Sequence, residues 1–203
     1  MKLISFLGAA LLALGTATAI AQPYPAGPNW QHPQPQRDLA GEASAMIKQG
    51  LEGMIQFMNA KPRPTDMKLA AFLEQQVVPQ FDFQRMAQMA MGPAYQRLDE
   101  EKAADLEQQI EQHFLKALVN KLSRFEQQQI QYFRPRRSGF NQAVVTVGIA
   151  NPGGYPSRFD FRLRLGKDGW KIFDVAANGQ SVVAFYRRHF NQPAWGAPVG
   201  ARR

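Results

Sequence analysis

The chain of 203 residues contains no cysteine and only three histidines, and its 16 acidic residues are outnumbered by 24 basic ones. Without cysteine it can form no disulfide, and it offers no processed N-terminal cysteine to which a lipid could be attached. Its most apolar run, residues 3–14, is too short to cross a bilayer with normal flanks. These absences exclude a disulfide framework and a lipid-anchored protein.

The N-terminus has the three parts of a secretory signal. Lys2 supplies the positive charge, residues 3–14 form the apolar segment, and Ala19-Ile20-Ala21 is a small-x-small cleavage site. We expect residues 1–21 to be removed after Ala21 and the mature protein to be periplasmic. Losing Lys2 lowers the basic count from 24 to 23, which against 16 acidic residues leaves a charge of +7.

A basic surface can bind nucleic acid, an acidic protein or an anionic membrane. Export and the absence of a motif that reads bases argue against nucleic acid. The densest basic segment, "FRPRR", is expected to be a loop and contains Arg134, Arg136 and Arg137. This loop is either simply solvated or docks on the acidic surface of a membrane complex.

The order of elements predicts an α+β fold. Residues 22–37 form a linker rich in Pro and Gln, and residues 193–203 form a disordered tail. Between them, in the domain 38–192, helical periodicity and capping residues predict helices over about 39–58, 66–78, 81–92 and 99–125. Alternating patterns then predict about four antiparallel strands between residues 127 and 175, with the N-terminal helices on one face of a curved sheet and an apolar pocket between them.

Residues suited to catalysis are scarce. His113, Glu107 and Glu111 do not share one helical face, so they are a poor metal site. Ser181, Asp174 and His189 lack the sequence of a nucleophile elbow, and Ser181 is better explained as a helix cap, with Asp174 as a partner for nearby amides. No phosphate-binding glycine loop is present. We therefore expect no metal and no cofactor. The apolar residues leave two interpretations open: they form an ordinary core, or they line an apolar cavity.

Two segments resemble a known family. "GWKIFDVAANGQSVVAFYRRHF" and "VVPQFDFQRMAQMAMGPAYQRLDEEKAADLEQQIEQHF" are similar, in order, to the MlaC or toluene-tolerance auxiliary family. The resemblance covers about residues 38–190. Asn178 stands where relatives often have an acidic residue, and a Pro/Gly-rich tail replaces further helical sequence. The C-terminal matches are Trp170, Asp174, Gly179, Ser181, Val182, Val183, Tyr186, Arg187 and Phe190.

The resemblance implies a periplasmic phospholipid carrier rather than an enzyme. Members of this family hold acyl chains in an apolar cavity and work with an inner-membrane ABC transporter complex and an outer-membrane lipoprotein/porin complex that maintain lipid asymmetry. We expect a monomer. A carrier of a polycyclic lipid such as a hopanoid, or a pocket enzyme acting on an apolar small molecule, are the alternatives.

The residues expected to contact lipid face the gap between helices and sheet. They are Met86, Met89, Phe114 and Leu118 from the helices, Val145, Val147, Phe159, Phe161 and Ile172 from the sheet, and Val183 and Tyr186 from the last helix.

Overall fold

The computed structural model describes residues 37–123, 129–151 and 153–190. These residues belong to one unit that begins at Arg37. The predicted signal, nearly all of the linker and the tail lie outside the described residues and stay predictions. None of the described helices combines the length and apolar character needed to cross a membrane.

The two long helices begin where the sequence predicts. α1 (Leu39–Met58) is capped by Asp38, whose Oδ1 accepts a hydrogen bond from the Gly41 amide at 2.9 Å. α4 (Glu100–Leu122) is capped in the same way by Asp99, which accepts from the Lys102 amide at 2.9 Å. Side-chain oxygens at these positions satisfy amides that a helix leaves unpaired, so both boundaries follow from local chemistry.

The helix expected over 66–78 ends earlier than predicted. α2 (Asp66–Phe72) widens into a π-helical turn at Leu73–Val77 and then tightens into a 3₁₀ turn at Val78–Gln80. Pro79 has no amide hydrogen and cannot continue an α-helix. α3 (Phe83–Met91) follows, capped by Asp82, and ends at Gly92, where φ is +61°. A 3₁₀ segment, Gly92–Arg97, leads into α4.

Within the described residues the sheet has six antiparallel strands, where the sequence predicts about four. They are β1 (Ile130–Tyr132), β2 (Arg136–Gly139), β3 (Gln142–Ile149), β4 (Ser157–Gly166), β5 (Gly169–Ala177) and β6 (Gln180–Ser181). Their order is β1-β3-β4-β5-β6, and β2 pairs with β3 beside β1. The expected loop at "FRPRR" is therefore partly wrong, because Arg136 and Arg137 belong to β2. The expectation missed this strand because all four of its residues are exposed and show no apolar alternation.

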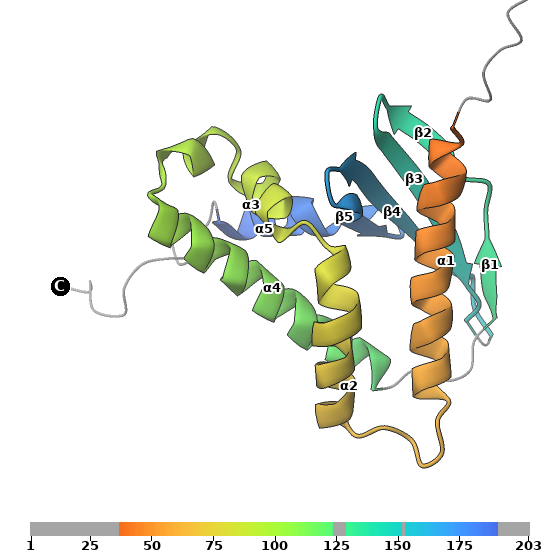
Figure 1. The fold of residues 1–203 in the computed structure, drawn as a ribbon. Helices are drawn as coiled ribbons and strands as arrows, with labels where there is room; N and C mark the ends of the chain where they lie inside the picture. The colour runs from red at the N-terminus through yellow and green to blue at the C-terminus, as the bar shows by residue number, and fades with distance from the viewer. Residues whose placement is uncertain (1–36, 124–128, 152, 191–203) are drawn as a thin grey trace, which may run out of the picture. The chain divides into compact units, whose positions relative to one another are not determined.

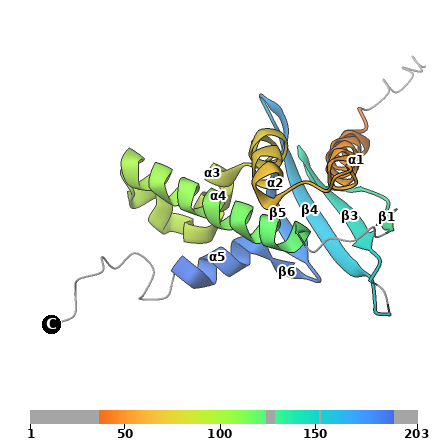
Figure 2. The same ribbon diagram turned by 90° about the horizontal axis from the view of Figure 1, so that it is seen from below.

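The two faces of the central strands differ in character. Ala143, Val145 and Val147 point to one side of β3, where α1 packs on them (Figure 1). Because side chains alternate along a strand, Arg158 and Arg162 of β4 point to the other side. Figure 2 shows α1 on one side of β3 and no described helix on the opposite side. The apolar face is thus covered by α1, whereas the opposite face carries exposed arginines on β4, although Val144 and Thr146 of β3 are buried on that face too.

A tight corner joins the sheet to the last helix. Asn178 and Gly179 both have positive φ, 48° and 83°, a conformation that glycine adopts without steric cost and asparagine tolerates. β6 follows at once, and α5 (Val182–Phe190) packs back on α3. The corner therefore returns the chain from the sheet to the helices.

Candidate functional site

The interior consists of three apolar clusters, which we name by their elements. The α1–sheet cluster lies between α1 and the inner face of β3, β4 and β5. The α3–α4–α5 cluster joins those three helices, and the α1–α2–α4 cluster joins the end of α1 to α2 and the end of α4. Each cluster has a buried centre and a fringe of half-buried apolar side chains. That fringe is the surface a ligand could cover.

The predicted contact residues are spread over these clusters. The α3–α4–α5 cluster contains Met86, Met89, Phe114, Val183 and Tyr186; the α1–sheet cluster contains Val145, Val147, Phe161 and Ile172; the α1–α2–α4 cluster contains Leu118. Phe159 is half-buried and belongs to none of them. The buried members, such as Met86 and Val145, complete the core. The half-buried ones, such as Phe114 and Phe161, remain the better candidates for contact with a ligand.

Phe81 connects two of the clusters, and the sequence analysis did not single it out. It packs against both the α3–α4–α5 cluster and the α1–sheet cluster. Its backbone forms a parallel bridge with Ile172, and its ring centroid lies 4.6 Å from that of Phe114 and 5.7 Å from that of Phe83. The sequence offered one signal for Phe81, which is its place in "FDF", directly before the Asp82 cap. At that position a half-buried aromatic residue lies between helix and sheet.

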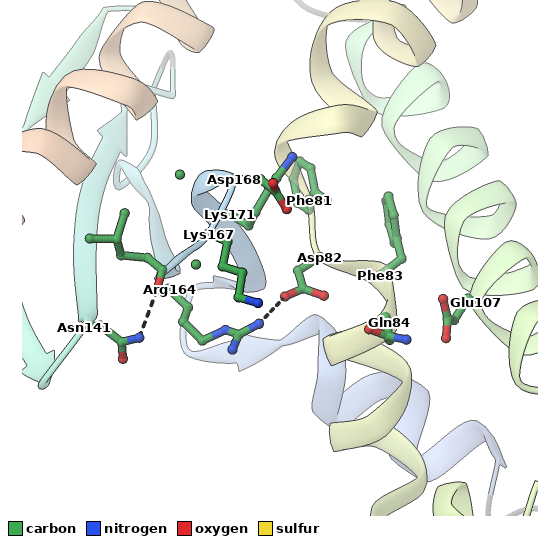
Figure 3. A pocket seen from close by; sticks show the side chains of 13 residues that line it. Phe81, Asp82, Phe83, Gln84, Glu107, Asn141, Arg164, Lys167, Asp168 and Lys171 are labelled. Atoms are coloured by element: carbon green, nitrogen blue, oxygen red, sulfur yellow. Dashed lines mark hydrogen bonds and ion pairs between the residues drawn. The ribbon is translucent and has the colours of Figure 1, made fainter.

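A pocket of about 730 Å³ opens beside Phe81, and we call it the Phe81 pocket. It lies where the turn between β4 and β5 meets the start of α3, and Glu107 of α4 also lines it. Phe81, Phe83 and Leu165 supply its apolar lining (Figure 3). Its size is in the usual range for small-ligand pockets.

The rim of the Phe81 pocket is charged. Arg164 pairs with Asp82 at 3.0 Å, and Lys171 donates a hydrogen bond to the Pro79 carbonyl. Figure 3 shows Arg164, Lys167 and Lys171 of the β4–β5 hairpin opposite Phe81 and Asp82. This lining, in which three apolar side chains lie among mostly polar and charged ones, suits a ligand that is itself amphipathic. It is a poor match for a ligand that carries only charge.

Glu107 forms the α4 side of this pocket. Its carboxylate accepts a short hydrogen bond from the Tyr95 hydroxyl, and this bond raises the pKa of Tyr95. The tyrosine therefore stays protonated and keeps donating. This contact joins the turn after α3 to α4 and fixes one wall of the pocket.

None of the eleven predicted contact residues lines the Phe81 pocket directly. Phe114 and Ile172 contact its lining, because the Phe114 ring packs against Phe81 and Phe83 and the Ile172 backbone forms a bridge with Phe81. A second hollow of about 370 Å³ lies on α2, where Phe57, Phe72 and Ala71 form its apolar part. Its lining comes from α1, α2 and the turn Leu73–Val77. The Phe81 pocket is the one that reaches the aromatic residues between helices and sheet.

The groups that might have supported catalysis have other partners. His113 Nδ1 lies 3.1 Å from the Tyr186 hydroxyl, which itself donates to the Ile110 carbonyl at 3.3 Å. Burial raises the pKa of Tyr186 far above its usual range, so it stays neutral. Across the described ranges, no three residues of metal-binding type lie together.

Asp174 is a structural centre, as predicted. Its carboxylate accepts hydrogen bonds from the Val183 amide at 3.1 Å and the Ser181 hydroxyl at 2.7 Å, and it pairs with Arg162 at 2.9 Å. Ser181 in turn accepts from the Ala184 amide at 3.1 Å, which confirms it as the cap of α5. Asp174 and Ser181 thus attach α5 to the sheet.

The fold and the Phe81 pocket define an α+β domain that keeps half-buried apolar surface behind a charged rim. The family model of the MlaC protein matches residues 48–194, and the chain belongs to this family. No curated protein matches the chain significantly.

A solved structure with the same fold is available for comparison. It is that of the phospholipid-binding protein from Ralstonia solanacearum in complex with a phospholipid. It is 22% identical to this chain, covers 73% of this chain and 85% of its own, and superposes with a TM-score of 0.67. The likeness confirms the α+β architecture predicted from the sequence.

Proposed function

We propose that this chain is a periplasmic carrier that holds a phospholipid by its acyl chains. Family membership supports it, and so does the bound phospholipid named for the Ralstonia protein of the same fold. The observation that carries the proposal is the half-buried apolar fringe around Phe81, Phe114 and Phe161, adjoined by a pocket with a charged rim. Acyl chains would cover the fringe while the head group stays near water.

Physical chemistry explains why such a carrier is needed. A diacyl lipid in water exposes roughly thirty methylenes at about 0.8 kcal/mol each, on the order of 20–25 kcal/mol. That free-energy cost prevents a free lipid from crossing the water of the periplasm, whereas a protein that buries both chains can carry the lipid across. Burial of the chains requires no acid, base or metal, so we assign the chain no catalytic role.

The finer proposal concerns the route. We place the chain, as a monomer, between an outer-membrane lipoprotein/porin complex and an inner-membrane ABC transporter complex, in the pathway that maintains outer-membrane lipid asymmetry. The predicted signal in residues 1–21 would bring it to the periplasm. The basic side chains of β2 are available for docking, since both Arg136 and Arg137 are exposed.

Native mass spectrometry of the purified chain, followed by lipid extraction, tests the cargo. We expect the measured mass to equal that of the protein plus a diacyl phospholipid, because bound acyl chains cover apolar side chains that would otherwise contact water. A polycyclic lipid in the extract would mean that the cargo is hopanoid-like and not a phospholipid. A lipid-free mass that stays lipid-free after incubation with phospholipid vesicles would contradict the carrier proposal altogether.

A further inference from the structure

The hairpin formed by β2 and β3 carries a protruding aromatic residue among arginines. Phe140 at its tip is 92% exposed, the most exposed phenylalanine among the described residues. Arg134, Arg136 and Arg137 precede it, and residues 133–142 contain no acidic side chain. A large apolar group held in water beside several cations needs an explanation, because folding gains nothing from its exposure.

The hairpin tip is held in shape and lies next to the Phe81 pocket. Arg137 Nη2 donates to the Phe140 carbonyl at 3.1 Å, which braces the turn. Asn141, the next residue, lines the pocket and donates through Nδ2 to the Leu165 carbonyl at 2.9 Å. Phe140 is therefore an exposed side chain next in sequence to a residue that lines the Phe81 pocket.

The neighbouring β4–β5 hairpin adds a further cation at the same end of the sheet. Gln142 of β3 pairs with Arg164 of β4, so the two hairpin tips are neighbours. Lys167 is exposed at the β4–β5 turn and has no ion pair within the described part of the chain. Of the nearby acids, Asp82 pairs with Arg164, Glu107 is half-buried and accepts from Tyr95, and Asp168 on this turn has no ion pair among the described residues. The exposed charge at this end is thus mainly positive.

We propose that this end of the molecule binds directly to the surface of an anionic phospholipid bilayer. Phe140 would enter the interfacial region while Arg136, Arg137 and Lys167 contact lipid phosphates. This orientation places the opening of the Phe81 pocket against the membrane, so a lipid could pass between bilayer and pocket without crossing water. Only that consequence rests on the proposed function. Residues 133–142 carry three arginines and no acidic side chain, and such a basic segment is attracted to the negative surface of an anionic bilayer.

Vesicle co-sedimentation with residues 22–203, the chain expected after removal of the signal, tests the proposal. We expect binding to vesicles of phosphatidylethanolamine with phosphatidylglycerol, little binding to phosphatidylcholine alone, and weaker binding as salt is raised. Phe140→Ala should lower binding about tenfold, because the interface loses one large apolar group. The double variant Arg136→Glu/Arg137→Glu should lower it by at least about tenfold through repulsion.

Matched controls separate this surface from general properties of the protein. Tyr155→Ala removes an aromatic side chain that is 95% exposed on the turn at the opposite end of β3, and it should leave binding unchanged. Lys116→Glu/Lys121→Glu makes the same change in net charge on the exposed side of α4 and should also have little effect. Equal losses in Phe140→Ala and Tyr155→Ala would overturn the proposal.

The remaining outcomes are also decisive. A chain that carries phospholipid but binds no vesicle would leave the proposed function standing and overturn membrane docking, assigning the arginines to an acidic protein partner. A chain that binds anionic vesicles through Phe140 but carries no lipid would support docking and count against the carrier. Equal binding to neutral and anionic vesicles would contradict the role of the arginines.

Discussion

Replacing Asp174 with alanine is expected to lower the free energy of unfolding by about 3 kcal/mol. The carboxylate is buried, and it accepts from the Val183 amide and the Ser181 hydroxyl. Alanine leaves these donors without their acceptor at the start of α5. Arg162 contributes less to the loss, because its side chain is 46% exposed and water can take the place of the carboxylate.

Chemical denaturation of three variants checks this expectation. Ser181→Ala removes only the cap of α5 and should cost about 1 kcal/mol. Asp105→Ala, on the exposed side of α4, should change stability by less than about 0.5 kcal/mol. If Asp174→Ala proved as harmless as Asp105→Ala, the attachment of α5 through this carboxylate would be wrong.

Replacing Phe161 with glutamate is expected to reduce bound phospholipid at least about tenfold, since an unpaired charge is strongly disfavoured against apolar chains. Phe161 lies on the inner face of β4, opposite Val145 of β3 and Val175 of β5. It is half-buried, so the lipid-free protein can expose the carboxylate to water and still fold. Val147 is a poorer position for this test, because its 1% exposure means that a charge there would disrupt the core.

Phe133→Glu is the matched control for this substitution. The Phe133 ring lies against the position where a side chain on Gly148 would begin, which is the face of β3 opposite Val147. It is 45% exposed, so the same chemical change should leave lipid retention intact. Lipid content is measured by extraction and mass spectrometry, with circular dichroism to show that both variants fold. Full retention by a folded Phe161→Glu protein would show that the inner face of β4 does not contact lipid.

Local chemistry made the helices predictable. Asp38, Asp82 and Asp99 each cap the helix that follows them, and the sequence pattern indicates each boundary within a few residues. The end of α2 was less predictable, because the widened turn at Leu73–Val77 depends on how the chain must approach the sheet before Phe81.

Tertiary proximity explains what the sequence could not predict. The rim pair of the Phe81 pocket joins Asp82 and Arg164, which are 82 residues apart, and no local pattern relates them. β2 pairs with the outer edge of β3, and all four of its residues are exposed. Its sequence therefore shows no alternation of apolar and polar residues. By contrast, Val145 and Phe161 were recognisable as inner-face residues from strand periodicity alone, although periodicity does not separate core from lining.

Photolabelling with a phospholipid that carries a diazirine near the end of one acyl chain would locate the residues that surround bound lipid. The carbene inserts into whatever side chains surround the chain, and peptide mass spectrometry locates the adducts. The account predicts adducts on the inward-facing residues around Phe81, Phe114 and Phe161, all members of the half-buried fringe. Adducts confined to exposed positions such as Tyr155 or the outer face of β4, or none at all, would contradict it.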